Sequence, residues 1–306
     1  EKETQNLLLQ SNTFDTTWVN TSSTETGGQA GYDGSNDAWL ISTTANGGRV
    51  SQSFSSKSGV YRVSVYAKAA SSNWLLILAN ASSNGDVYFD LENGVIGNEG
   101  NAAFDAQIES VGNGWYRCSF AGNYSGLFEA RIYPAAGNFD VSGSNSIYIQ
   151  DAQLEQGLVA RDLLTTTTTA LYEGITDNVP RLDYTDSSCP SLKLEPQRTN
   201  LINASEYFNG SDWINVSVTA TENATTSPEG VQNATRLDFS GTQLKRFEQN
   251  TPNAATACTT SIFMKHIDHA IVMARMDSTS GASYAWFNIQ TGEVLKVDGA
   301  NSSVPD

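Results

Sequence analysis

Apolar and polar residues alternate along several short runs of the chain. In Tyr61–Lys68 the odd-numbered positions are apolar, and Val87–Leu91 and Ile147–Gln150 alternate with the same period of two. This period indicates half-buried β-strands, because successive side chains of a strand point to opposite faces. Clusters of Gly and Asn, such as Ala45–Gly48 and Gly112–Gly114, separate the runs and predict turns. No amphipathic helix longer than two turns is evident, so the pattern predicts an all-β fold.

The chain also repeats itself. Four segments recur in the same order, 194 to 198 residues further on: Asn6–Phe14 as Asn200–Phe208, Trp18–Asn20 as Trp213–Asn215, Tyr61–Lys68 as Cys258–Lys265, and Val87–Gly94 as Ala285–Gly292. Collinear matches with so little drift predict a duplicated unit. Strands at even spacing over each copy are typical of an antiparallel β-sandwich, so the sequence predicts tandem jelly-roll domains.

The duplication predicts where the domains lie. We expect a first module over residues 1–160, a linker over 161–199, and a second module over 200–306. The closing segments of the first copy, Gly112–Arg117 and Ile147–Asp151, do not recur before Asp306. The second module is therefore expected to be incomplete at its C-terminus, with the polypeptide continuing beyond it. Within the linker, the run Thr165–Thr169 predicts an extended segment. Two short apolar runs bounded by prolines predict a β-hairpin or, alternatively, edge strands that pair with a neighbouring chain.

Composition and charge narrow the function classes. The 306 residues are 39% hydrophobic and 10% aromatic, which fits folded domains rather than a disordered chain. With 33 acidic and 17 basic side chains, the formal net charge is −16. This charge excludes a nucleic-acid partner, since phosphate binding needs clustered Lys and Arg. No apolar stretch approaches the roughly 18 residues of a membrane span, so membrane insertion is not expected.

Residues for catalysis or metal binding are sparse. The two histidines, His266 and His269, would point to opposite faces of a strand, and the three cysteines show no disulfide or zinc spacing. A carboxylate pair could serve glycoside hydrolysis, yet the second copy replaces Asp90 with Asn288. No nucleophile elbow, phosphate-binding loop or zinc-protease motif is found. The sequence therefore predicts a protein that is not an enzyme.

Carbohydrate binding is the better supported chemistry. Sugar sites present aromatic faces to the pyranose ring and polar side chains to its hydroxyls. Positions predicted to point outward in the first module carry five such residues, which we take as candidate carbohydrate-binding residues: Tyr66, Tyr88, Arg131, Tyr133 and Tyr148. The alternative is that these tyrosines only pack, since Tyr favours strands in general. Trp18, Trp115 and Trp213 are assigned to the core.

Several motifs resemble a known protein class. Asn6–Trp18, Gly114–Arg117 and Ile147–Gly157 resemble the carbohydrate-binding-module-like jelly rolls of bacteriophage structural proteins. The inter-repeat stretch Asn178–Leu201, with its Val-Pro-Arg-Leu-Asp-Tyr and Leu-Lys-Leu-Glu-Pro segments, is similar to one recurring in phage tail-fibre and head-appendage proteins. Together the resemblance covers most of the chain. The jelly-roll motifs alone are shared with polysaccharide-degrading enzymes.

The resemblance implies a virion appendage. Such a fibre, spike or decoration protein would sit on the virion surface, in an extracellular setting, and present its modules to host-surface glycans. It would contact other virion proteins and form a homo-oligomer, such as a trimer that buries the threonine run and the hairpin. Related modules hold a structural Ca²⁺, which here would use Asp15 and Asp151, while Asn209 replaces the first acid in the second copy. The alternatives are an accessory carbohydrate-binding region of an extracellular polysaccharide-degrading enzyme, or a structural sandwich without ligand.

Overall fold

The protein is built from antiparallel β-strands. The computed structural model describes residues 4–79, 85–173, 181–183, 191–193, 200–240, 245–251, 258–278 and 281–299. This part of the chain holds strands, turns and loops but no α-helix, which confirms the predicted all-β class. None of the described segments is a helix long and apolar enough to cross a membrane. The chain divides into two compact units, Glu1–Gln249 and Asn250–Asp306, which are described separately.

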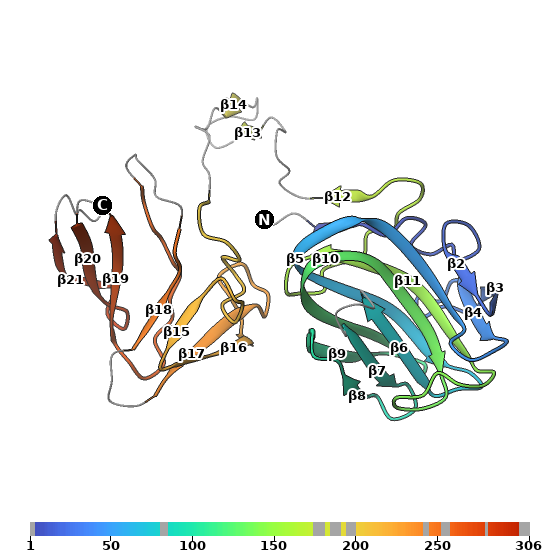
Figure 1. Ribbon diagram of the computed structural model, residues 1–306. Helices are drawn as coiled ribbons and strands as arrows, with labels where there is room; N and C mark the ends of the chain where they lie inside the picture. The colour runs from blue at the N-terminus through green and yellow to red at the C-terminus, as the bar shows by residue number, and fades with distance from the viewer. Residues whose placement is uncertain are drawn as a thin grey trace. The chain divides into compact units, whose positions relative to one another are not determined.

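A ten-stranded antiparallel sheet dominates the first unit (Figure 1). Its strands follow each other closely along the chain. They are β2 (Val19–Thr21), β3 (Ser23–Gln29), β4 (Ala38–Thr43), β5 (Arg49–Ala69), β6 (Trp74–Ala79), β7 (Asp86–Asp90), β8 (Val95–Glu99), β9 (Ala103–Gly112), β10 (Trp115–Ala135) and β11 (Ser146–Gln156). The period-two runs found in the sequence fall on β5, β7 and β11.

Two strands of 21 residues, β5 and β10, connect different parts of this sheet. The first half of β5 pairs with β2 and with the second half of β10. That half of β10 also pairs with β6, and β7 and β8 follow β6 in the sheet. The second half of β5 pairs with β11 and with the first half of β10, which also pairs with β9. The register shifts between Tyr124 and Glu129, midway along β10. Figure 1 shows both long strands strongly curved, so each takes part in two groups of strands.

Both groups of strands share one hydrophobic core. The odd positions from Tyr61 to Ala67 of β5 and those of β6 are buried in it, and so are alternate residues of β7, β10 and β11: Val63, Val65, Ala67, Leu75, Ile77, Val87, Phe89, Phe120, Ile132, Ile147 and Ile149. The predicted inward faces of these runs are therefore confirmed. Each fully buried Val, Leu, Ile or Phe contributes about 1.5–3 kcal/mol to stability, so this alternation decides the fold.

The first residues of the chain are anchored by Asn6, which is fully buried. Its amide nitrogen donates to the carbonyls of Ala152 (3.0 Å) and Leu164 (2.8 Å). Its amide oxygen accepts from the backbone N–H groups of Leu8 (3.1 Å) and Leu154 (3.2 Å). All four hydrogen-bonding positions of the side chain are thereby used, which offsets the cost of burying it.

The segment after β11 folds back onto the start of the chain. β1 (Thr4–Asn6) pairs with β12 (Leu171–Glu173). Thr166, in the middle of the threonine run, is buried; its hydroxyl donates to the carbonyl of Leu8, and its N–H donates to the hydroxyl of Ser11. The run was expected to be extended and buried in an oligomer. The run contains no strand and bends at Thr167–Thr169, so the predicted extended segment is not observed, and the chain itself covers Thr166.

Short sheets make up the remaining described residues. β13 (Arg181–Asp183) pairs with β14 (Ser191–Lys193), so the hairpin predicted between the repeats is present. β15 (Ile214–Val216) pairs with β18 (Arg246–Glu248), and β16 (Val218–Thr225) pairs with β17 (Ala234–Phe239). In the second unit, β19 (Ile271–Ser278), β20 (Gly281–Asn288) and β21 (Glu293–Gly299) form a three-stranded sheet.

These short sheets repeat the pairings of the large sheet. The register of β15 on β18 matches that of β2 on β5, with Asn215 beside Phe247 where Asn20 lies beside Val50. The pair β16–β17 matches β3–β4, and the sheet β19–β20–β21 matches β6–β7–β8, in each case strand by strand. The duplication seen in the sequence therefore extends to hydrogen-bonded registers. The predicted domain limits at residues 160 and 199 stay predictions.

Side-chain contacts repeat as well. The indole of Trp18 donates to the carbonyl of Gln10, and the indole of Trp213 donates to the carbonyl of Ala204, both at 3.1 Å. The accepting residues, Gln10 and Ala204, both have a positive φ, 50° and 45°. Trp18 is almost fully buried as predicted, whereas Trp213 is only half-buried.

Candidate functional site

A second apolar cluster covers the outward side of β6, β7 and the second half of β10. Leu76, Tyr88, Tyr133 and Ala135 are buried in it, with Trp74, Leu78 and Val141 packed around them. These positions alternate with the core residues of the same strands, so both faces of this part of the sheet are apolar. An apolar outward face is unusual for an antiparallel sheet and marks this side as a candidate site.

A hollow of about 300 Å³ opens beside this cluster. Two aromatic rings, two carboxylates and two amides line it: Asp86, Tyr88, Asn98, Glu99, Asn101 and Phe139, together with Gly100. The rings of Tyr88 and Phe139 lie 5.9 Å apart and are tilted by 36°. Tyr88 is only 7% exposed, whereas Phe139 is 69% exposed, so Phe139 offers the accessible ring face.

The loop after β10 holds Phe139 in place. The side-chain oxygen of Asn138 accepts from the backbone N–H of Asn98 at 2.8 Å, which joins the loop to β8. A tight turn follows, in which the N–H of Asp140 donates to the carbonyl of Gly137 at 3.1 Å. Phe139 itself has a φ of 70°, a left-handed conformation that costs a bulky residue about 1–2 kcal/mol. A strained and exposed aromatic residue is more typical of a binding site than of packing.

The hollow is electrostatically negative. Asp86 and Glu99 contribute carboxylates, and none of the described lining residues is Lys or Arg. Burial raises the pKa of Asp86 above its ordinary value. Burial is also the main cause that raises the pKa of Tyr88, followed by the charges of Asp86 and Asp140. Tyr88 therefore stays a neutral phenol that can donate a hydrogen bond at neutral pH.

Arg131 supports the neighbouring Tyr133. Its guanidinium contacts the carboxylate of Glu129 at 2.7 Å and donates to the hydroxyl of Tyr133 at 3.3 Å. The bond to Glu129 is the main cause that raises the pKa of Arg131 above its ordinary value. Arg49 lies over the ring of Tyr133, 5.7 Å from its centroid, a cation–π contact. Tyr133 thus contacts Arg49 through its ring and Arg131 through its hydroxyl, and Arg131 is already engaged by protein groups.

The structure brings three of the five predicted sugar-binding residues to one side. Tyr88, Arg131 and Tyr133 lie on the outward side of β7 and β10, as the alternation predicted. Both tyrosines are nevertheless almost fully buried, because Trp74, Leu76 and the loop after β10 pack against them. Their assignment as ligand contacts stays a prediction.

Tyr66 and Tyr148 lie in the other group of strands. Tyr66 stacks on Tyr32 with centroids 3.8 Å apart, and the guanidinium of Arg117 lies 5.6 Å from the ring centroid of Tyr66. Protein groups therefore already cover much of that ring. Tyr148 is half-buried on β11, opposite Leu40 and Lys68. The five predicted residues do not form one site.

The two predicted calcium ligands are in different environments. Asp15 is exposed, whereas Asp151 is 6% exposed and accepts a hydrogen bond from the hydroxyl of Tyr32 at 3.1 Å. Burial raises the pKa of Asp151 to about 6. Among the described residues, no group of three or more His, Cys, Asp or Glu side chains is arranged to hold a metal ion. The calcium pair stays a prediction.

Sequence reasoning missed most of the residues that line the hollow. Asp86 could have been included, since period two places it on the same side of β7 as Tyr88. Phe139 lies in a loop without periodicity, so the sequence carried no signal for it. Asn98, Glu99 and Asn101 follow at the end of β8 and reach the hollow only through the fold.

A second hollow, of about 350 Å³, lies near the N-terminal segment. Its lining is mostly apolar or hydroxyl-bearing and includes Leu7, Leu9, Phe54, Ala170 and Tyr172. No carboxylate lines it, and Lys57 is its one charged residue among those described. Against five polar side chains in the first hollow, six line this one: Thr17, Gln52, Ser53, Ser55, Lys57 and Tyr172. Among the described residues it lacks carboxylate acceptors such as Asp86 and Glu99.

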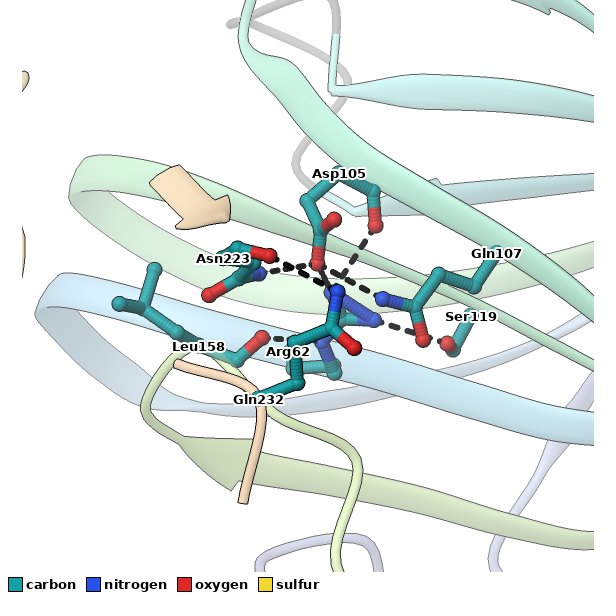
Figure 2. Close-up of polar contacts among 7 residues, drawn as sticks. All are labelled: Arg62, Asp105, Gln107, Ser119, Leu158, Asn223 and Gln232. Atoms are coloured by element: carbon teal, nitrogen blue, oxygen red, sulfur yellow. Dashed lines mark hydrogen bonds and ion pairs between the residues drawn. The ribbon is translucent and has the colours of Figure 1, made fainter. Parts of the chain in front are cut away.

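Figure 2 shows a buried polar network around Arg62, whose side chain is fully buried. The guanidinium donates to the carbonyl of Leu158 (2.7 Å), to the hydroxyl of Ser119 (2.9 Å) and to the carbonyl and carboxylate of Asp105. Asn223, from β16, also donates to that carboxylate. Burial lowers the pKa of Arg62, while Asp105 opposes the shift. Every contact is to a protein group, so this network is structural.

The same network continues into the hairpin β16–β17. The side chain of Gln232 donates to the carbonyl of Asn223 at 2.9 Å, and Phe104 on β9 stacks on Tyr207 with centroids 4.9 Å apart. Within the first unit, the start of the second repeat therefore packs on the first repeat.

Comparisons with models of known families and with characterised proteins found no match to this sequence.

Proposed function

We propose that the chain consists of two β-sandwich modules of the jelly-roll type. The two groups of strands joined by β5 and β10 share one core, which is how a sandwich encloses its interior. The repeated registers of the short sheets support a second module of the same kind.

We further propose that the first module binds carbohydrate without catalysis. The observation that carries this proposal is the hollow in which the exposed ring of Phe139 stands beside two carboxylates and two amides. An aromatic ring packs against the apolar face of a sugar, while carboxylate and amide oxygens accept hydrogen bonds from its hydroxyls. The outward apolar cluster beneath the hollow makes the platform rigid, because Tyr88 and Tyr133 are packed on all sides.

The lining indicates the ligand class. Asp86 and Glu99 would repel a uronic acid, a sialic acid or a sulfated sugar, and no described cation in the lining offsets them. Neutral hexoses and their N-acetylated derivatives supply hydroxyl and amide donors that suit carboxylate acceptors. We therefore propose an uncharged surface glycan as the ligand.

The second repeat would not share this specificity. It keeps an aromatic residue at the place of Tyr88, namely Trp286, which is 38% exposed. At the places of Asn98 and Glu99 it has Lys296 and Val297. The polar set of the hollow is thus specific to the first repeat, and we expect one sugar site in the described part of the chain.

The biological setting follows from the sequence resemblance. We propose a virion appendage, such as a tail fibre, head fibre or spike, that presents these modules to host-surface carbohydrate. Calcium bound through Asp15 and Asp151 remains part of this proposal. A rise in the melting temperature on adding Ca²⁺, absent in Asp151→Asn, is the result expected for the calcium site.

A glycan array with the full chain, followed by calorimetric titration of the best ligand, tests the proposed function. Phe139→Ala should abolish binding with little loss of stability, because the ring is mostly exposed. Tyr172→Ala is the matched control, since it removes an exposed aromatic ring (46% exposed) from the other hollow. The proposal fails if no glycan binds, or if Tyr172→Ala weakens binding as much as Phe139→Ala.

A further inference from the structure

Four Asn-Gly pairs lie within the described residues, and their surroundings differ: Asn46–Gly47, Asn93–Gly94, Asn113–Gly114 and Asn209–Gly210. In such a pair the glycine nitrogen can attack the side-chain carbonyl carbon of the asparagine, because glycine has no side chain to hinder the approach. The reaction needs a glycine N–H that solvent can reach and an asparagine side chain that can turn towards it. The contacts of each pair therefore decide whether it reacts.

Two of the pairs are held by hydrogen bonds. In Asn46–Gly47 the glycine N–H donates to the carbonyl of Val141 at 2.9 Å, and the asparagine oxygen accepts from the N–H of Gly143 at 2.8 Å. In Asn93–Gly94 the glycine N–H donates to the carbonyl of Asp90 at 2.9 Å, and the asparagine amide donates to the carboxylate of the same residue at 2.8 Å. Both reacting groups of these pairs are thus engaged.

A third pair, Asn209–Gly210, is covered at its glycine. Gly210 is buried, and a side-chain carbon placed on it would lie 2.9 Å from the ring of Tyr207. Base from the solvent must remove the glycine proton before the nitrogen can attack. The burial of Gly210 therefore disfavours the reaction in this pair.

The fourth pair, Asn113–Gly114, is exposed and not held. It forms the two-residue turn between β9 and β10, and both residues have a positive φ, 54° and 77°. In the part of the chain that the structure describes, no hydrogen bond engages the side chain of Asn113 or the N–H of Gly114. The asparagine side chain can therefore rotate towards the glycine nitrogen.

The side chain of Lys68 runs along this turn. Lys68 lies opposite Trp115, the residue that follows the turn, in the pairing of β5 with β10. A side-chain carbon placed on Gly114 would lie 3.5 Å from Cε of Lys68, the carbon that bears the ammonium group. Among the described residues no carboxylate pairs with this ammonium. An unpaired cation beside the turn stabilises the negative charge that develops on the glycine nitrogen and on the attacked oxygen.

We propose that Asn113–Gly114 is a site of spontaneous deamidation and that Lys68 assists the reaction. Solvent base takes the proton of the Gly114 nitrogen, which forms a bond to Cγ of Asn113. The C–N bond of the side-chain amide breaks, and its nitrogen takes up a proton and leaves as ammonia. One water molecule then opens the succinimide ring. Attack on Cγ gives aspartate, and attack on the main-chain carbonyl carbon gives isoaspartate.

The product changes the turn in two ways. A carboxylate replaces a neutral amide beside Lys68, so the lysine gains a partner of opposite charge. In the isoaspartate form the main chain also gains a methylene group, which alters a turn of only two residues and weakens the pairing of Gly112 with Trp115. None of the described residues that line the proposed carbohydrate site takes part, so this inference does not rest on that function.

Peptide mapping by mass spectrometry, after incubation of the full chain at mildly alkaline pH, tests the proposal. Conversion of Asn113 should be at least about tenfold faster than conversion of Asn46 or Asn93, because two hydrogen bonds must open in each of those pairs first. The rate at Asn113 should rise with pH, since base removes the glycine proton. The site is overturned if Asn113 reacts no faster than Asn46, Asn93 and Asn209.

Three variants test the role of Lys68. A unit charge about 4 Å away in water changes a rate about fivefold, so Lys68→Met should slow conversion of Asn113 by about that factor. Lys68→Arg should keep the parent rate, and so should Lys57→Met, which removes another lysine of β5. High salt should slow the parent reaction but not that of Lys68→Met, a dependence that a merely structural lysine would not give. An unchanged rate in Lys68→Met, with the β9 and β10 amides still protected from hydrogen exchange, overturns the role of the lysine.

Discussion

Gln249 holds the backbone of Asn203 through two hydrogen bonds. Its amide nitrogen donates to the carbonyl of Asn203, and its amide oxygen accepts from the N–H of Asn203, both at 2.8 Å. In the first repeat, Gln52 makes the same two bonds to Leu9, at 2.7 and 2.6 Å. The bonds go to the main chain, so the change from Leu to Asn at the held position does not affect them. The duplicated units thus share an anchor as well as a strand order.

The two glutamines should differ in their contribution to stability. Gln52 is 3% exposed and its two bonds to the half-buried Leu9 are partly shielded from water, so Gln52→Ala should cost about 1–3 kcal/mol. The bonds of Gln249 are open to solvent, and in Gln249→Ala water can replace them, so its cost should stay below about 1 kcal/mol. Urea unfolding of both variants measures the difference, and equal losses would contradict the role of burial.

The buried Arg62 should be among the most sensitive positions. In Arg62→Met the carboxylate of Asp105 loses its buried counter-charge, and removing one partner of a buried pair costs about 3–5 kcal/mol. The matched variant Arg236→Met removes the partner of Asp238, where both side chains are about half exposed. Surface pairs contribute about 0–1 kcal/mol, so the free energy of unfolding of this variant should be close to that of the parent protein. Similar unfolding midpoints for the two variants would show that the network around Arg62 is not a structural support.

Local alternation predicted much of the fold but little of the candidate site. Val63, Val65 and Ala67 follow period two and are buried as predicted, because a strand with one apolar face can bury only that face. Arg62 and Ser64, on the opposite face, were expected to be polar and outward, yet both are buried. They are buried by residues distant in sequence; Leu158, for example, accepts a hydrogen bond from Arg62. Local alternation cannot reveal such contacts.

The candidate site shows the same limit. Tyr88 and Tyr133 were correctly placed outside the main core, but their burial depends on a loop after β10 that has no periodic pattern. Phe139 in that loop is the accessible ring of the hollow, and its position is fixed by contacts to β8. Sequence reasoning therefore placed Tyr88 and Tyr133 on this face of the sheet but gave no signal for Phe139.

Stability should depend on pH through Glu155, which is 1% exposed. Burial raises the pKa of this carboxyl in the folded protein, although hydrogen bonds from Gln153 and Arg161 oppose the shift. A raised pKa means that the folded state binds the proton more tightly than the unfolded chain does. The stability contributed by the protonated form is therefore complete below the ordinary Glu pKa and is lost as the pH rises through the raised value.

The variant Glu155→Gln should remove this pH dependence. It keeps the oxygen that accepts from Gln153 and Arg161 and carries no charge at any pH. We expect its free energy of unfolding, relative to the parent protein, to rise between pH 4 and pH 7.5. Urea unfolding at both pH values measures the change, and a constant difference between the two proteins would contradict the assignment.

The negative lining of the hollow should decide which glycans bind. At about 4 Å, one charge pair in water contributes about 1 kcal/mol, so each lining carboxylate should weaken an anionic glycan about fivefold relative to its neutral counterpart. Asp86→Asn and Glu99→Gln should each narrow that preference, whereas Asp212→Asn, which removes an exposed charge outside the hollow, should not. Titrations with a neutral glycan and its sulfated form measure the ratio of the two affinities. High salt should reduce this ratio, because it screens the repulsion between the carboxylates and the sulfate. Equal binding of both glycans to the parent protein would show that Asp86 and Glu99 do not face the ligand.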